Sequence, residues 1–342
     1  MKSLNLIIVS VITFSGNLLG QTFIKVTTDV VVNGGGSLSN AWGDYDNDRF
    51  VDLFLAEGSN NTSKLYKNNR DGSFIKIIIG PIISEKRGIS GSWGDYDNDG
   101  DLDIFIAAGG NVGNVDNFLY SNNGDGTFTR ITTGVIVNDG GASISGSWGD
   151  YDNDGDLDLF VANRGLNENF LYSNNGNAAF TKITAGPIVT DVEPSLGGSW
   201  GDYDNDGDLD LFVANLGSDN FLYSNNGDGT FTKITTGEVV NDGGASIGSC
   251  WGDYDNDGDL DLFVANLGEN NFLYSNNGDG TFAKVTTEVV ALDMENSFGS
   301  SWADYDNDGD LDLFVSNLGA ENNALYLNNR KEVKNALSNI FY

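Results

Sequence analysis

The sequence predicts an all-β protein, a β-propeller of six four-stranded blades. The motif Trp-Gly-Asp-Tyr-Asp-Asn-Asp-Gly-Asp-Leu-Asp, intact or nearly so, occurs six times, at Trp42, Trp93, Trp148, Trp200, Trp251 and Trp302. These starts lie 51, 55, 52, 51 and 51 residues apart. A period of about fifty residues indicates copies of one supersecondary unit that stack or close into a ring. Each copy also contains four stretches with the composition of strands.

The four expected strands follow the same order in every copy. Around Trp148, an alternating strand at 127–131 precedes a loop of Asn, Asp, Gly and Ser, and a small-residue strand at 145–149 contains the tryptophan. An apolar strand at 157–162 follows the aspartate-rich loop, and a fourth strand occupies 169–173. A tight turn of Asn and Gly then returns the chain to the next copy. Four strands per unit are typical of a propeller blade.

The two ends of the repeat region predict how the ring closes. The chain begins its repeats with a strand at 22–28, whereas the sixth copy ends with a strand at 323–327 and has Val333 where other copies have Phe. We expect the N-terminal strand to complete the last blade, so that no sheet edge stays open. A seven-bladed ring and a truncated longer protein are the alternatives. The propeller is expected to span 21–330, and the tail at 331–342 is unassigned.

The aspartate-rich loop has the pattern of a calcium site. Asp95, Asp97, Asp99 and Asp103 alternate around one tight turn that Gly100 permits, so their carboxylates converge. Without a cation, these like charges would repel one another and raise each other's pKa. An EF-hand is the rival interpretation, but it needs flanking helices and a glutamate at the twelfth loop position, where an apolar residue stands here. We therefore predict a calcium loop between two strands.

The repeats resemble the FG-GAP and VCBS family, whose calcium-loop propeller repeats occur in the integrin α-chain head and in many secreted bacterial proteins. The resemblance covers about residues 21–330, and Asp-x-Asp-x-Asp-Gly-x-x-Asp is intact in five copies. It implies calcium ligation by the carboxylates at the first, third, fifth and ninth loop positions and by the backbone carbonyl at the seventh. The residues are Asp95, Asp97, Asp99, Asp101 and Asp103; Asp150, Asp152, Asp154, Asp156 and Asp158; Asp202, Asp204, Asp206, Asp208 and Asp210; Asp253, Asp255, Asp257, Asp259 and Asp261; and Asp304, Asp306, Asp308, Asp310 and Asp312.

The first copy departs from this pattern. Asp44, Asp46, Asp48 and Asp52 remain, but Arg49 replaces the glycine and a phenylalanine replaces the seventh-position aspartate. An arginine forced to positive φ costs about 1–2 kcal/mol and brings a like charge beside the ion. We expect about one Ca²⁺ per repeat, with the first site the weakest or empty.

Composition and charge exclude several functional classes. The 342 residues include 17 Lys plus Arg against 50 Asp plus Glu, for a net charge of −33. Nucleic acid and anionic membranes are therefore poor partners. The absence of histidine removes His-dependent catalytic triads and most zinc sites. The single cysteine, Cys250, cannot form an internal disulfide and is expected to be a small buried residue.

The N-terminus predicts export. Residues 1–20 combine one positive charge at Lys2 with an apolar run from Leu4 to Phe14 and the small or apolar residues Leu18, Leu19 and Gly20 before Gln21. This pattern is typical of a secretory signal peptide and is too short for a stable membrane anchor. No later stretch is long and apolar enough to span a membrane, so we expect a secreted or cell-surface protein.

These features predict a non-enzymatic recognition or adhesion module with structural calcium and an extracellular protein or glycan as ligand. The resemblance implies that ligands meet loops on the face opposite the calcium loops. One alternative is the propeller of a polysaccharide-acting enzyme that uses loop acids. The candidate acids are Glu57, Asp116, Asp191, Glu193 and Glu295. Another alternative is a display module of a longer surface protein. No catalytic residue and no other cofactor is predicted.

Overall fold

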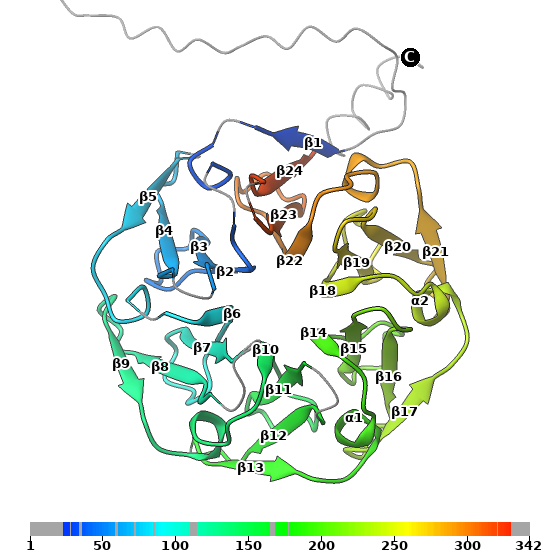
Figure 1. Cartoon of the computed structure of the whole chain (residues 1–342), viewed down its shortest axis with the longest axis horizontal. Coiled ribbons are helices and arrows are strands. Elements are labelled where there is room, and N and C mark those ends of the chain that lie inside the picture. The colour runs from blue at the N-terminus through cyan, green and yellow to red at the C-terminus, as the bar shows by residue number, and fades with distance from the viewer. Residues whose placement is uncertain are drawn as a thin grey trace, which may run out of the picture.

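Each repeat folds into one antiparallel four-stranded sheet, and six such sheets are arranged radially around a central axis (Figure 1). The computed structural model describes residues 23–329 except 28, 34–35, 59–60, 72, 85, 110–114, 165–167, 177 and 320. The expected signal peptide and the C-terminal tail lie outside the described residues. The all-β, six-bladed prediction is confirmed.

The strands of the first three blades run from the axis outward in chain order. Blade one contains β2 (Ser39–Gly43), β3 (Asp52–Ala56), β4 (Lys64–Asn68) and β5 (Phe74–Ile77). Blade two contains β6 (Gly88–Gly94), β7 (Asp103–Ala108), β8 (Phe118–Asn122) and β9 (Phe128–Ile131). Blade three contains β10 (Ser143–Gly149), β11 (Asp158–Asn163), β12 (Phe170–Asn174) and β13 (Phe180–Ile183).

The next two blades repeat this order. Blade four contains β14 (Ser195–Gly201), β15 (Asp210–Asn215), β16 (Phe221–Asn225) and β17 (Phe231–Ile234). Blade five contains β18 (Ser246–Gly252), β19 (Asp261–Asn266), β20 (Phe272–Asn276) and β21 (Phe282–Val285).

The sixth blade joins the two ends of the repeat region. It contains β22 (Ser297–Ala303), β23 (Asp312–Asn317) and β24 (Ala324–Asn328), and its outermost strand is β1 (Phe23–Val26). β1 pairs antiparallel with β24 in the register Phe23 opposite Asn328 and Val26 opposite Leu325. The predicted closure by the N-terminal strand is therefore confirmed, and in Figure 1 β1 lies at the outer edge of that blade.

The apolar core lies between blades rather than within one. Every residue of β11 and of β15 is buried, because these second strands are covered on both faces. Phe160 of blade three shares a cluster with Val213 of blade four. Leu55 of blade one likewise shares a cluster with Phe314 of blade six. The same kind of core thus crosses the seam where the ring closes.

An aromatic stack repeats between neighbouring blades. Tyr151 in the aspartate-rich loop of blade three lies face to face with Trp200 of blade four, with ring centroids 6.0 Å apart and an interplanar angle of 11°. The Trp200 indole N–H donates to the Ser147 carbonyl of blade three at 3.2 Å. Gly149 leaves space for this ring, since a Cβ there would lie 2.7 Å from it. The tryptophans therefore pack blade against blade.

The described part of the chain contains four short helical turns that were not expected from the sequence. They lie between the last strand of one blade and the first of the next: 3₁₀ turns at Val135–Val137 and Val289–Ala291, α1 (Pro187–Thr190) and α2 (Glu238–Asn241). Each turn buries two adjacent apolar residues, such as Ile188 and Val189 in α1. The signal was an apolar pair inside each otherwise polar linker.

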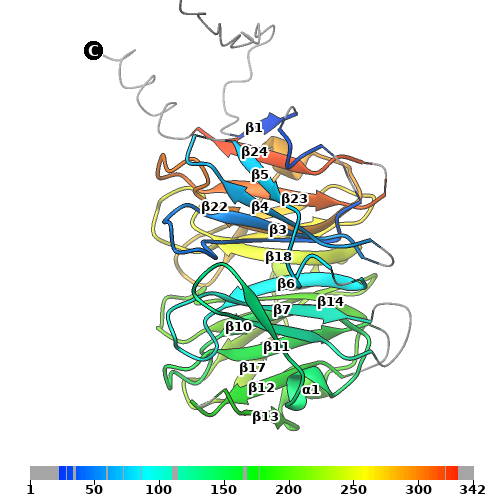
Figure 2. The ribbon, with the colours of Figure 1, turned by 90° about the vertical axis from the view of Figure 1, so that its left-hand side faces the viewer.

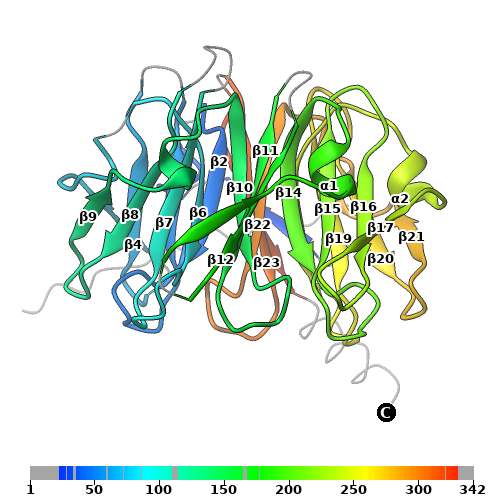
Figure 3. The ribbon, with the colours of Figure 1, turned by 90° about the horizontal axis from the view of Figure 1, so that it is seen from below.

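Strand direction divides the loops between two faces of the disc, which Figures 2 and 3 show edge-on. The aspartate-rich loops join first to second strands, and the tight turns join third to fourth strands, so both lie on one face. We call it the aspartate face. The loops from second to third strands and the linkers between blades lie on the opposite face.

We expect Phe23→Ala to destabilise the protein by about 3–5 kcal/mol. Phe23 is only 3% exposed and packs against Tyr254 of blade five and against Trp302 on β22 of its own blade, with centroid separations of 5.8 and 5.9 Å. Chemical denaturation of the two proteins would measure the difference. Ile24→Ala is the matched control, because Ile24 on the same strand is 41% exposed. Equal small effects of both substitutions would contradict closure by β1.

Candidate metal centres

The aspartate-rich loops hold their shape through hydrogen bonds to their own carboxylates. In blade two, Asp95 accepts the backbone N–H groups of Asp99 and Gly100 at 3.0 and 2.9 Å. Asp99 in turn accepts the N–H of Asp101 at 3.0 Å. Gly100 has φ of 94°, and Asn98 has φ of 61°. The glycine and asparagine of the motif therefore supply the left-handed backbone that the tight turn requires.

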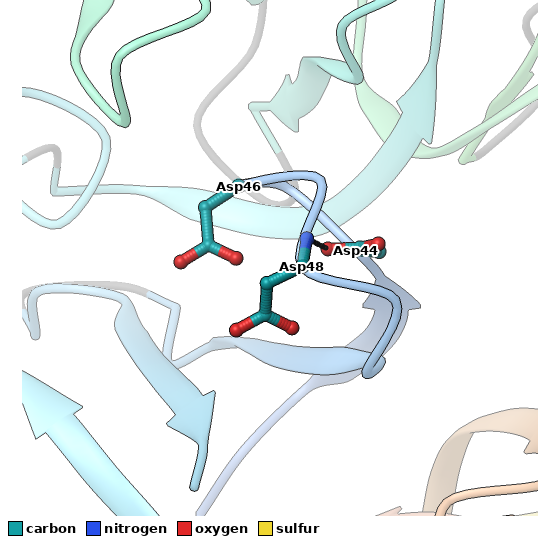
Figure 4. A group of neighbouring side chains, drawn as sticks. All are labelled: Asp44, Asp46 and Asp48. Carbon is teal, nitrogen blue, oxygen red and sulfur yellow. Dashed lines mark hydrogen bonds between the residues drawn. The ribbon is translucent and has the colours of Figure 1, made fainter. Parts of the chain in front are cut away.

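The loops bring their carboxylates together as the spacing predicts. Within each of five loops, one oxygen from each of three aspartates lies within 4.8 Å of the others. The groups are Asp44, Asp46 and Asp48; Asp95, Asp97 and Asp99; Asp150, Asp152 and Asp158; Asp202, Asp204 and Asp206; and Asp253, Asp255 and Asp261. Figure 4 shows the first group, in which the Asp48 backbone N–H donates to Asp44.

The ninth-position aspartate has a second role that the sequence did not reveal. Asp103 is buried, and its two carboxylate oxygens accept the backbone N–H groups of Tyr96 and Asn122 at 3.2 and 2.8 Å. It thereby ties the start of the loop to the end of β8. Asp158, Asp210 and Asp261 make the same pair of bonds in their blades.

Neighbouring loops are also joined to one another. Asn98 of blade two donates to the side chain of Asp156 in blade three at 2.6 Å, and Asn153 donates to Asp208 at 2.6 Å. The same link runs from Asn47 to Asp101, from Asn205 to Asp259 and from Asn256 to Asp310. One carboxylate oxygen of each seventh-position aspartate thus accepts a bond from the preceding loop. The family resemblance implies that these residues would offer an ion their backbone carbonyls.

In the metal-free loops, burial and the closeness of like charges disfavour the ionised form of the aspartates. Burial, and then the charges of Asp97 and Asp99, raise the pKa of Asp103 to about 7. Burial and the neighbouring carboxylates raise the pKa of Asp97 as well. In the sixth loop, Asp304 and Asp312 each have a buried oxygen without a hydrogen-bond partner. Crowded carboxylates and unsatisfied buried oxygens are features that a hard divalent cation would relieve.

The sixth loop differs from the others in one hydrogen bond, because the backbone N–H of Asp308 donates to Asp306 at 3.2 Å and not to the first-position aspartate. Gly309 donates its N–H to Asp304 at 3.0 Å, and Asp308 accepts the N–H of Asp310 at 2.8 Å. Burial, followed by the charges of Asp306 and Asp308, raises the pKa of Asp312 to about 8. Loops two to five thus share one hydrogen-bond pattern, and the sixth departs from it at one bond. The aspartates of all five loops offer oxygen donors, which suit Ca²⁺.

Most loop acids considered for catalysis lie in ion pairs instead. Glu57 pairs with Lys64 at 2.8 Å, and Asp191 pairs with Lys233 at 2.7 Å. Asp191 also accepts the hydroxyl of Tyr223 at 2.9 Å. Glu295 pairs with Lys25 at 2.8 Å. These three carboxylates therefore stabilise contacts between strands and linkers of the propeller. The structure does not bring Asp116 or Glu193 into such a pair among the described residues.

A cavity of about 300 Å³ lies on the central axis, lined by the first strands of all six blades. Glycine, serine, tryptophan and aliphatic residues make up most of its described lining. Among the described lining residues, Cys250 is the one titratable side chain, and burial raises the pKa of its thiol to about 12. The cavity therefore presents no charged acid or base in its described lining at neutral pH.

Comparison with known protein families identifies the repeats. Five overlapping stretches, residues 44–106, 95–161, 150–213, 202–264 and 253–315, match the model of the FG-GAP-like repeat. Together they span well over half of the chain. Each stretch begins at the first aspartate of one loop and ends within the second strand of the next blade.

The curated relatives include Cartilage acidic protein 1 from Homo sapiens, 30% identical over 163 residues, which are 44% of this chain and 24% of that protein. Its Xenopus tropicalis counterpart is 30% identical over 169 residues, 44% of this chain and 25% of that protein. The chain thus spans about a quarter of the length of the curated relatives it matches.

Solved structures share the propeller fold at low sequence identity. A putative gluconolactonase aligns with a TM-score of 0.56 and 11% identity over 90% of this chain and 92% of that one. BBS1N, solved in complex with ARL6DN, aligns with a TM-score of 0.55 and 12% identity over 90% and 97%. At this identity the likeness concerns the fold alone. No helix among the described residues is long and apolar enough to cross a membrane.

We expect the metal-free protein to lose stability as pH rises from about 5 to 8. The pKa values of Asp103, Asp158, Asp210 and Asp261 are about 7 in the folded protein against about 4 for an unfolded chain. In this pH range the folded state holds protons that the unfolded state has already released. The free energy of unfolding therefore falls as pH rises and these protons dissociate.

Thermal unfolding of chelator-treated protein at pH 5 and at pH 8 measures this effect. Aspartates with lowered pKa values, such as Asp125 and Asp228, act below about pH 4 and do not interfere. An equal or higher midpoint at pH 8 would contradict the expectation.

Proposed function

Because the chain belongs to the FG-GAP-like repeat family, we propose that it is an exported, calcium-stabilised recognition module without enzymatic activity. Its ligand is an extracellular protein or glycan, bound by loops on the face opposite the aspartate loops. The observation that carries this proposal is the repetition of one aspartate-loop geometry in blades two to five, with one altered hydrogen bond in blade six.

Calcium has a structural role in this proposal. The loop aspartates at the first, third, fifth and ninth positions and the seventh-position carbonyl would hold the ion, which would neutralise crowded carboxylates between the first and second strands. Export supports the assignment, because extracellular modules bind Ca²⁺ with dissociation constants of about 10⁻⁴–10⁻³ M. The name of the relatives, which contains the words cartilage and acidic, is consistent with an acidic protein outside cells.

Two observations support recognition over catalysis. The loop acids Glu57, Asp191 and Glu295 are engaged in ion pairs. The axial cavity also offers no carboxylate pair among its described lining residues. A glycosidase needs two carboxyl groups on either side of a reacting bond. The opposite face instead presents loops that differ between copies in length and sequence, which is the arrangement expected of a binding surface on a constant scaffold.

We expect millimolar Ca²⁺ to raise the unfolding midpoint of the mature protein strongly relative to chelator. Ligands that bind only the folded state stabilise it by RT ln(1 + [L]/Kd) per site, about 1.4 kcal/mol at ten times Kd. Several loops acting together would therefore contribute about 5 kcal/mol or more. Differential scanning calorimetry with Ca²⁺, Mg²⁺ and chelator measures the effect, and Mg²⁺ is the control for charge screening. Equal unfolding midpoints in all three conditions would contradict the structural role of Ca²⁺.

The ligand face can be tested with matched pairs of acids in blades four and five. On the opposite face, Asp219 and Glu269 line a hollow together with Gly243. On the aspartate face, Asp228 and Asp279 occupy the tight turns of the same two blades. Replacing either pair with alanine changes the net charge equally.

For a ligand that binds at this hollow, we expect the Asp219→Ala/Glu269→Ala variant to weaken binding at least tenfold, and the Asp228→Ala/Asp279→Ala variant to leave it within about twofold. A glycan array and a panel of extracellular-matrix proteins, both in Ca²⁺, would supply the ligand for titration. Loss of binding only in the Asp228→Ala/Asp279→Ala variant would show that the ligand binds the aspartate face, which would contradict the proposal.

A further inference from the structure

The first aspartate loop and the neighbouring end of β4 carry three basic side chains that the equivalent positions of blades two to five lack. Lys67 on β4 stands where four other blades have serine, at Ser121, Ser173, Ser224 and Ser275. Arg70 stands in the following turn where the same blades have glycine. Arg49 replaces the loop glycine itself. All three departures bring positive charge to one loop.

Two of these cations contact the carboxylates that an ion would use. The Lys67 ammonium bonds directly to Asp46 and lies 3.1 Å from Asp48 Oδ2. Arg70 Nη2 lies 3.1 Å from the same Asp48 oxygen. The side chains of Asp46 and Asp48 are only 20% and 10% exposed, so these contacts are partly shielded from water. The third- and fifth-position carboxylates of this loop are thus already paired.

The loop keeps its backbone shape despite the missing glycine. Arg49 adopts the left-handed conformation with φ of 73°, and its N–H donates to Asp44 at 2.6 Å, as Gly100 does to Asp95 in blade two. The first loop is therefore a folded copy of the others in which two carboxylates, those of Asp46 and Asp48, are paired with cations from within the chain.

We propose that Lys67, assisted by Arg70, permanently takes the place of calcium in blade one, so that the protein binds five calcium ions and not six. The count of five rests on the proposed calcium role of the other loops, whereas the cation role of Lys67 does not depend on it. Blade one, which adjoins the seam where β1 closes the ring, is then stabilised at any calcium concentration.

Native mass spectrometry of the protein in Ca²⁺ tests the count. We expect five ions in the wild type, six in the Arg49→Gly/Lys67→Ser/Arg70→Gly variant, which restores the residues of blade two, and four in the reverse control Ser121→Lys. Six ions in the wild type would overturn the proposal. So would five ions in the triple variant when its circular dichroism matches the wild type.

A second measurement distinguishes this inference from the proposed function. In chelator, we expect Lys67→Met to lower the unfolding midpoint by about 2–4 °C, corresponding to about 1 kcal/mol in a large domain. Lys76→Met, at an exposed lysine of the adjacent β5, should leave the midpoint unchanged. If the wild type retains no calcium, the calcium role of the other loops fails. Equal midpoints of the two lysine variants would then overturn the role of Lys67 independently.

Discussion

The fold depends on one constraint: no blade can bury its apolar faces without a neighbour on each side. The second strands are buried throughout, and the clusters that cover them always combine two consecutive blades. An open array of such sheets would expose one face at each end, so closure into a ring is the arrangement that removes both exposed faces. The cluster that contains Leu55 and Phe314 shows that the interface between blades six and one is packed with buried apolar side chains, as the other blade interfaces are.

The aspartate motif contributes to the closed ring through three of its residues. Its first residue shapes the loop, its ninth residue anchors the third strand, and its seventh residue receives the asparagine of the preceding blade. The circle of asparagine-to-aspartate links cannot pass from blade six to blade one, because Phe50 stands at the seventh position there. At that junction Asn68 reaches the backbone carbonyl of Tyr305 at 3.4 Å, the longest of the equivalent contacts.

The repeat period and strand patterns predicted the six blades and even the partner of the N-terminal strand. The spacing of the aspartates also predicted that carboxylates of one loop converge, and the structure brings three of the four expected ones together in each of five loops. The sequence did not reveal that Asp103 accepts a hydrogen bond from the end of β8. Such a bond depends on how the loop and the strand lie in the folded blade, which the spacing of residues along the chain does not give. The contact of Lys67 with Asp46 was missed for the same reason. The sequence signal was a lysine at a position where blades two to five have serine. This signal can be interpreted only once β4 is known to end beside the aspartate loop.

The strand order of blade six also has a consequence for how the chain folds. β1 is synthesised first, but its partner β24 lies about three hundred residues later, as in the pairing of Phe23 with Asn328. Blades one to five can each form from local hairpins, whereas the final sheet requires one long-range pairing with a high entropic cost. Until the last strand emerges, β1 has no partner strand, and the growing chain carries an unpaired apolar segment. Synthesis of β24, rather than the folding of any single repeat, is therefore required before the ring can close.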